Sequence, residues 1–198
     1  MVVIALVPLA WALGTFPSAT LVARAKGRNI LAEGSGNPGA TNVGRLLGWR
    51  YGLLVLAMDF AKGAIAAGVG LAVGGRPGAL VLGAAAIVGH TFPLYRKGGK
   101  GVAAGAGMLF VLFPLIAAGF AVVWLVIARV LKKASLASLV VTVLFPVAVW
   151  VAGYDRWEVA VLAALAVLVV VRHAANIRRL VRNQEIDLNA GGPVAHGP

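Results

Sequence analysis

Long apolar stretches separated by short basic segments constrain this chain more than any other feature of its sequence. Of its 198 residues, 61% are hydrophobic and only 12% are charged, about half the charged share of an ordinary soluble domain. Runs of this kind are typical of membrane-spanning helices. The sequence therefore predicts an all-α, multi-pass integral protein of the inner or plasma membrane. The apolar stretches cover residues 1–23, 51–74, 79–95, 102–131, 139–152 and 159–171.

Basic residues collect between these stretches, and their distribution predicts the topology. The formal net charge is +12, which in a soluble protein would suggest nucleic acid. Here the excess of Lys and Arg in cytoplasmic loops explains it, and we expect no nucleic-acid partner. Arg76 and Arg156 then fall outside, and Lys62 lies within the membrane. No Lys or Arg precedes Arg24, so we expect an uncleaved first helix with a periplasmic N-terminus. The segments expected in the cytoplasm are 24–50, 96–100, 129–133 and 172–182.

This arrangement requires residues 102–131 to enter the membrane and return, with a break near Pro114. Each arm would have about 14 residues and span roughly 21 Å, which is short of a hydrocarbon core of about 30 Å. The sequence thus predicts about seven membrane helices, some of them short. One unbroken helix over 102–131 would give six instead. Pro8 and Pro17 are expected to bend the first helix.

The length allows one domain, which we expect over residues 1–187, followed by a disordered tail at 188–198 that is rich in Gly and Pro. There is no cysteine, so the chain has no disulfide and no thiolate metal ligand. Three histidines with few carboxylates near them do not predict a metal site, and we expect no cofactor.

The most distinctive polar segment is the glycine-rich loop 34–45. Gly34, Gly36 and Gly39 have the spacing of a dinucleotide fingerprint, but Pro38 interrupts the pattern and no strand precedes it. A single loop of this kind is most often only a turn. A second glycine-rich loop at 97–101, however, also carries a cation. Arg45 and Lys100 beside two such loops favour a phosphate site, because glycine lets backbone N–H groups approach an anion.

Other polar residues lie in or beside the apolar stretches. His173 is at the end of the last one, where a lone histidine is most often a helix cap, and Asn176 follows on the same helical face. Asp59 and Lys62 also share a face and are expected to form a structural ion pair within the membrane. Glu185 is expected to be structural or solvated.

Taken in order, these segments resemble one family, the bacterial membrane glycerol-3-phosphate acyltransferases that use acyl phosphate as donor. The first family motif resembles residues 34–42 followed by Arg45. The second resembles 89–93 and 97–103. The third resembles His173, Asn176 and Glu185 with their neighbours. The pairs Asp59 with Lys62 and Ser135 with Ser138 are also similar.

The resemblance implies transfer of a fatty acyl group from acyl phosphate to the sn-1 hydroxyl of glycerol 3-phosphate. The products are lysophosphatidic acid and inorganic phosphate, and the step is the first acylation of bacterial phospholipid synthesis. The expected partners are these two substrates and the lipid bilayer, and the basic loops would allow docking of a soluble enzyme that makes acyl phosphate. A small anion or phosphoester transporter is the alternative, although no internal repeat supports it.

Roles can be assigned on this basis. The expected catalytic residues are Ser35, Arg45, His173 and Asn176. Acyl phosphate is assigned to Ser35, Asn37, Gly39, Ala40, Thr41, Asn42, Ser135 and Ser138, mainly through backbone N–H groups of the first loop. Glycerol 3-phosphate is assigned to Arg45, Lys97, Gly98, Gly99, Lys100, Gly101, His173 and Asn176. Either His173 or the phosphate of the donor takes the hydroxyl proton.

Overall fold

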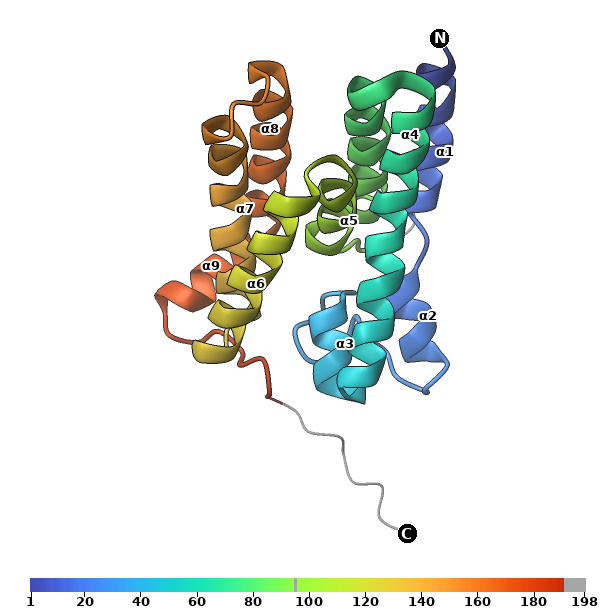
Figure 1. Ribbon diagram of the computed structural model, residues 1–198. Helices are drawn as coiled ribbons and strands as arrows, with labels where there is room; N and C mark the ends of the chain where they lie inside the picture. Colours follow the sequence, from blue (N-terminus) through green and yellow to red (C-terminus); the bar gives the residue numbers. More distant parts are fainter. Residues whose placement is uncertain (95, 191–198) are drawn as a thin grey trace.

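The computed structural model describes residues 1–94 and 96–190, and within these ranges the chain is helical with no β-strand (Figure 1). The predicted helical class is therefore confirmed. The helices, in chain order, are α1 (Val2–Gly14), α2 (Ser18–Arg24), α3 (Ala40–Leu47), α4 (Trp49–Thr91), α5 (Val102–Leu112), α6 (Pro114–Val130), α7 (Ala134–Val151), α8 (Arg156–Arg172) and α9 (Ala174–Val181).

Proline and glycine interrupt two of the apolar stretches, whereas Pro8, which was also expected to bend the first helix, lies inside α1 and does not end it. Pro17 stands between α1 and α2, where its ring and missing N–H prevent one continuous helix. Gly74 and Gly75 leave the helical conformation inside α4, and Gly75 has a φ of 61°. They turn α4 into a hairpin whose two arms correspond to the predicted stretches 51–74 and 79–95 (Figure 1).

The predicted break near Pro114 separates α5 from α6. The 11 residues of α5 span only about 16 Å. Among the described residues, three spans are long and apolar enough to cross a membrane, namely Val2–Arg24 (α1 with α2), α4 and α7, and the bent pair α8 and α9 makes a fourth. One of the three is α4, which contains two arms. Figure 1 shows the N-terminus at the end of the bundle opposite α2, α3 and α9.

Small residues let α1, α4 and α5 approach closely, as is usual for helices packed in lipid. A Cβ on Gly63 would overlap the backbone of Ala104, and one on Gly107 would overlap that of Phe60. A Cβ on Gly89 would likewise overlap the backbone of Trp11. These helices form one side of the molecule and α6 to α9 form the other (Figure 1).

An ion pair joins the two sides at the end away from α3 and α9. Arg76, at the tip of the α4 hairpin, lies 2.5 Å from Glu158 of α8 and also donates to the carbonyl of Leu112. Glu158 is almost completely buried. The guanidinium packs 4.8 Å from the ring of Phe113. The sequence alone does not indicate this pair, because Glu158 and Arg76 are 82 residues apart.

Candidate active site

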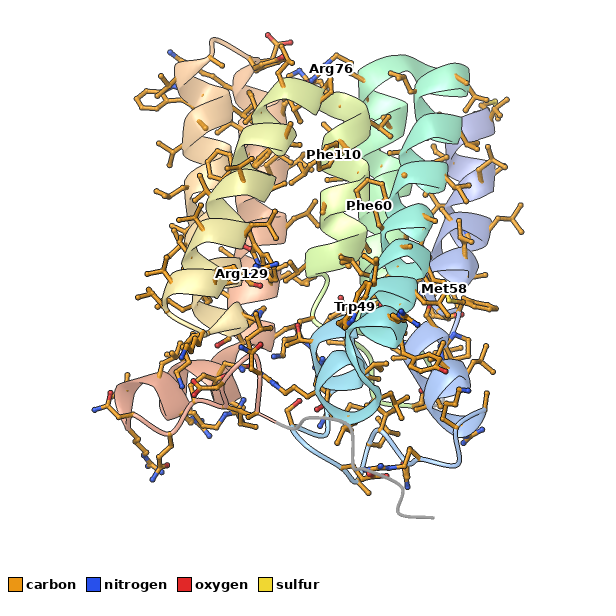
Figure 2. All side chains as sticks on the ribbon, turned by 60° about the horizontal axis from the view of Figure 1, so that its bottom comes forward. Trp49, Met58, Phe60, Arg76, Phe110 and Arg129 are labelled. Carbon is orange, nitrogen blue, oxygen red and sulfur yellow. The ribbon has the colours of Figure 1, made fainter. Side chains whose placement is uncertain are left out.

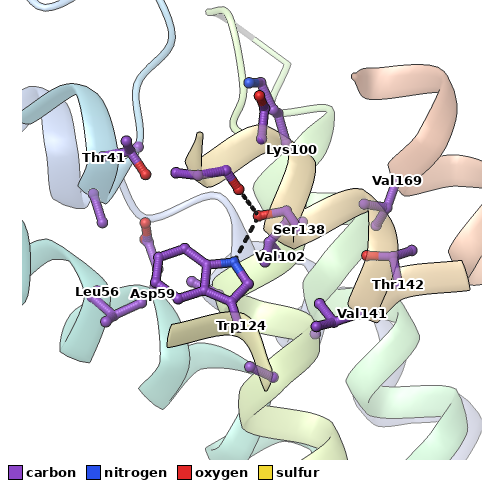
Figure 3. Close-up of a pocket in the computed structure, with 18 of the residues that line it drawn as sticks. Thr41, Leu56, Asp59, Lys100, Val102, Trp124, Ser138, Val141, Thr142 and Val169 are labelled. Atoms are coloured by element: carbon purple, nitrogen blue, oxygen red, sulfur yellow. Dashed lines mark hydrogen bonds between the residues drawn. The ribbon is translucent and has the colours of Figure 1, made fainter. Parts of the chain in front are cut away.

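A cavity of about 1250 Å³ lies between the two sides of the bundle. Its apolar part is lined by side chains of α4 to α8, among them Phe60, Phe120, Phe145 and Leu162. Its polar part is formed by α3 and the loop before it, the start of α5, the start of α7, and the junction of α8 with α9. Figure 3 shows this transition, with Lys100 and Thr41 at the polar part and Val141 and Trp124 further along.

Most residues assigned from sequence come together in this cavity. The three motifs are far apart in the chain but line the same space. The assigned residues in the lining are Ser35, Asn37, Gly39, Ala40, Thr41, Asn42, Arg45, Lys100, Gly101, Ser135, Ser138, His173 and Asn176, and Asp59 and Glu185 border it as well.

Asn42 shapes the first loop from within. Its buried side-chain amide accepts a hydrogen bond from the N–H of Ser35 at 3.0 Å and donates to the carbonyls of Ile30 and Glu33. Its backbone N–H donates to the carbonyl of Gly39. Asn42 was assigned to the donor phosphate, and this assignment needs correction because its groups are used inside the loop. The N–H groups of Ala40 and Thr41, in the first turn of α3, have no acceptor among the described residues.

Arg45 holds a segment near the C-terminus over the polar part of the cavity. Its Nε donates to the carbonyl of Asp187 at 2.8 Å and its Nη2 to that of Ile186 at 2.9 Å. Burial lowers the pKa of Arg45, and the charge of Glu185 partly offsets this effect. Among the described residues the guanidinium donates to neutral carbonyls and to no carboxylate, and it keeps donors for a further acceptor.

A hydrogen-bonded network centred on Glu185 organises the other half of the polar part. Its carboxylate accepts from Asn176 at 2.7 Å, from Ser135 at 2.9 Å and from Arg179 at 2.8 Å. Burial raises the pKa of Glu185, but these hydrogen bonds outweigh burial and hold the pKa below its usual value. Asn176 Oδ1 in turn accepts from Lys100 at 2.5 Å.

Lys100 is a buried cation whose surroundings shift its pKa. Burial lowers its pKa to about 8, with the negative charge of Glu185 opposing the shift. Lys100 contacts a neutral amide, and no carboxylate of the described chain pairs with it directly. A phosphate would supply the missing negative charge.

His173 lies at the junction of α8 and α9 and is almost completely buried. Its Nδ1 is 2.8 Å from the carbonyl of Val169. A carbonyl oxygen only accepts, so Nδ1 carries the hydrogen and Nε2 has a free lone pair. The ring can therefore accept a hydrogen bond from a hydroxyl group.

The second glycine-rich loop is placed differently from its assignment. Lys97, Gly98 and Gly99 do not line the large cavity and instead border a small one behind His90. The carbonyls of both glycines accept from Arg172, and the N–H of Gly99 donates to the carbonyl of His90. A Cβ on Gly99 would overlap the imidazole of His90. These glycines therefore support Lys100, and their expected contact with the phosphate needs correction.

Asp59 and Lys62 form an ion pair of 2.5 Å, and Lys62 also donates to the carbonyl of Phe16 at 2.7 Å. His90 Nδ1 lies 3.7 Å from Asp59 Oδ1. The pair links α4 to the break between α1 and α2. Asp59 borders both cavities.

The two serines of α7 lie at different depths. Ser135 serves the Glu185 network, whereas Ser138 donates to the carbonyl of Ala134 and accepts from Trp124 Nε1 at 3.0 Å (Figure 3). The hydroxyl of Ser138 is thus engaged at the boundary between the polar and apolar parts. Trp124 was not singled out from the sequence, because it lies in an unbroken apolar run.

The segment at 186–189 also borders the site, although no motif in the sequence predicted this. The N–H of Leu188 donates to the carbonyl of Lys132, and Leu188 and Asn189 line the cavity. The disordered tail was predicted from residue 188, and residues 191–198 of it lie outside the described part of the chain. Within residues 1–94 and 96–190, no group of three or more His, Asp or Glu side chains could hold a metal ion.

The chain is similar to known glycerol-3-phosphate acyltransferases over nearly its whole length. A family model described as glycerol-3-phosphate acyltransferase matches residues 4–183. A glycerol-3-phosphate acyltransferase of Hydrogenovibrio crunogenus is 39% identical over 96% of this chain and 92% of its own. One from Jannaschia sp. is 41% identical over 89% of this chain and 88% of its own.

Solved structures agree with these relatives. The crystal structure of PlsY, an integral membrane glycerol 3-phosphate acyltransferase, in its glycerol 3-phosphate form has a TM-score of 0.90 and 36% identity. The match covers 94% of this chain and 96% of that one. The lysophosphatidic acid form of PlsY matches with a TM-score of 0.86.

The Glu185 network generates a prediction about stability. Glu185→Gln keeps the shape of the side chain but removes the charge that faces Arg179, Asn176 and Ser135. We expect a loss of about 2 kcal/mol of stability, since hydrogen bonds to a buried charge are strong, and a large loss of activity. Thermal unfolding in detergent measures the first effect.

Asp187→Asn is the matched control, because its carboxylate is half exposed and Lys133 is its one ion-pair partner among the described residues. It should change stability by less than about 1 kcal/mol. Equal melting temperatures for the two variants would contradict a central role for Glu185.

Proposed function

This chain belongs to the glycerol-3-phosphate acyltransferase family, and we propose that acyl phosphate is the donor from which it acylates the sn-1 hydroxyl of glycerol 3-phosphate. The products would be lysophosphatidic acid and inorganic phosphate. The observation that carries the proposal is one cavity whose polar part holds cations without carboxylate contacts, Arg45 and Lys100, and whose other part is apolar. Two phosphates and one acyl chain match these parts.

We assign glycerol 3-phosphate to the side of the cavity formed by Lys100, His173 and Asn176. Lys100 would bind the phosphate, because its charge is not cancelled by a contacting carboxylate. Asn176 and His173 Nε2 would orient the attacking hydroxyl. Arg45 stands opposite, with donors left over for either phosphate.

We assign the donor head group to the first loop and the start of α3. The free N–H groups of Ala40 and Thr41 point to an anion at this helix N-terminus, and Ser35 and Asn37 line the same wall. The acyl chain would extend along Phe120, Phe145 and Leu162. Its burial favours binding by about 0.8 kcal/mol per CH₂ group.

The chemistry needs little assistance from the protein, because acyl phosphate is already an activated anhydride. The hydroxyl oxygen attacks the acyl carbon, the bond from that carbon to the phosphate oxygen breaks, and phosphate leaves. We propose that the departing phosphate takes the hydroxyl proton. The protein then contributes position and positive charge, which together can supply most of a rate enhancement.

The donor can be tested directly with the purified protein in detergent. Palmitoyl phosphate and glycerol 3-phosphate should release phosphate and form lysophosphatidic acid, whereas palmitoyl-CoA should give no product. Both compounds present the same acyl chain, so only the leaving group differs. Product from palmitoyl-CoA alone would overturn the proposed donor.

The lowered pKa of Lys100 predicts a pH dependence. A lysine with a pKa of about 8 is charged at pH 7 and mostly neutral at pH 9, while a phosphate monoester is a dianion at both values. The KM for glycerol 3-phosphate should therefore rise by up to about tenfold from pH 7 to pH 9. Lys100→Arg stays charged, so its KM, although altered, should not rise over this range; a parallel rise would contradict the assignment.

His173→Gln separates the two candidates for the proton acceptor. Gln retains a hydrogen-bonding group but is not a base, so the proposed role of the phosphate predicts a kcat within about threefold of the wild type. Loss of a general base costs about 100-fold or more. A fall of that size in kcat, measured by phosphate release at saturating substrates, would assign the proton to His173.

A further inference from the structure

The large cavity is open along its side, between the first arm of α4 and α6. Apolar residues of its lining are also strongly exposed. On α4 these are Trp49, Leu53 and Leu56, with exposed fractions of 70%, 55% and 42%, and on α6 Leu125 is 51% exposed. In an integral membrane protein, exposed apolar side chains on membrane helices face lipid. The apolar part of the cavity is therefore continuous with the bilayer through this side.

One cation stands at the polar end of this opening. Arg129 lies in the last turn of α6 and lines the cavity together with Ala121 and Leu125. Residues at intervals of four share one helical face. Arg129 therefore lies on the same face of α6 as Ala121 and Leu125, which line the cavity. Figure 2 shows Arg129 on α6 and Trp49 at the start of α4, on the two sides of the opening.

Arg129 differs from the other cations of the cavity. Arg45 is held by two carbonyls and Lys100 by Asn176. Arg129 is exposed and forms no hydrogen bond or ion pair with the described residues. Arg178, on the amphipathic helix α9, is also exposed but is not part of the lining. Arg129 is thus a cation available to a ligand in the opening itself.

We propose that Arg129 is the residue that first binds the phosphate of the lipid-borne donor and guides it through the side opening. This inference rests on the proposed function. A donor whose acyl chain lies in the bilayer keeps its charged head group at the membrane surface, where an arginine at a helix end also lies. Arginine matches a phosphate with two parallel hydrogen bonds. Trp49 across the opening is suited to the same interface, because its ring is amphipathic.

The proposal makes Arg129 a positioning residue and not a catalytic one. A cation at an entrance increases capture of an anion, while the chemical step is left to the groups inside. Replacement of Arg129 should therefore raise the KM for the donor alone. Glycerol 3-phosphate is soluble in water and does not need an opening toward lipid. The contribution of Arg129 to donor binding should also weaken at high salt, because an exposed charge is screened.

The test compares Arg129→Ala, Arg129→Lys and the control Arg178→Ala in the phosphate-release assay with palmitoyl phosphate. Near a membrane surface one Arg contributes roughly fivefold in affinity for an anion. We expect Arg129→Ala to raise the KM for palmitoyl phosphate about that much, with kcat and the KM for glycerol 3-phosphate within about twofold. Arg129→Lys should recover most of the loss, and Arg178→Ala should behave as the wild type.

Salt provides a second measurement that a purely structural role would not affect. Raising ionic strength should increase the wild-type KM for palmitoyl phosphate and leave that of Arg129→Ala nearly constant. Unchanged kinetics of Arg129→Ala, an equal effect of Arg178→Ala, or a fall confined to kcat would each overturn the proposal. Wild-type protein that is inactive with palmitoyl phosphate would instead overturn the proposed donor, and the role of Arg129 with it.

Discussion

The buried carboxylate of Glu185 holds the polar end of the molecule together. It accepts hydrogen bonds from Ser135 of α7 and from Asn176 and Arg179 of α9, and through Asn176 it reaches Lys100 before α5. A buried carboxylate is tolerated only when its oxygens are satisfied in this way. The contacts that stabilise the charge of Glu185 also bring α7, α9 and the segment before α5 together at the cavity. The hydrogen bonds that stabilise the charge of Glu185 are therefore also the contacts that assemble this half of the site.

Two further buried carboxylates form ion pairs elsewhere in the bundle. Asp59 pairs with Lys62 next to the break between α1 and α2, and Glu158 pairs with Arg76 at the far end. Between these points the helices pack through glycine and apolar side chains, which have little directional preference. Arg76 with Glu158 joins α4 to α8, and Lys62, which is paired with Asp59 within α4, joins α4 to the carbonyl of Phe16. These contacts therefore fix which segments meet. The cavity lies between these points, with α4 and α6 both in its lining, and the pair of Arg76 with Glu158 joins its two sides at the end away from α3 and α9.

Local features of the sequence predicted local features of the structure. The breaks at Pro17 and Pro114 and the separation of stretch 51–74 from stretch 79–95 follow from the conformational properties of proline and glycine, which act on neighbouring residues. The gathering of the motifs at one cavity followed from placing basic loops on one side of the membrane. The positions of Gly98 and Gly99 were not predictable in this way. Whether a glycine faces a ligand or the imidazole of His90 depends on packing between segments, which spacing alone does not contain.

The role of residues 186–189 could not be predicted from the sequence for a related reason. Composition indicates only that such a segment cannot form a core, whereas its order comes from Arg45 and from Lys132, which are distant in the chain.

The contacts of Arg45 and Lys100 also favour the binding of a phosphate. Arg45 is held by carbonyls and Lys100 by an amide, so their geometry is restrained while no contacting carboxylate of the described chain neutralises their charge. A phosphate that enters gains two positioned cations without first breaking an ion pair, and the cost of burying its charge falls accordingly.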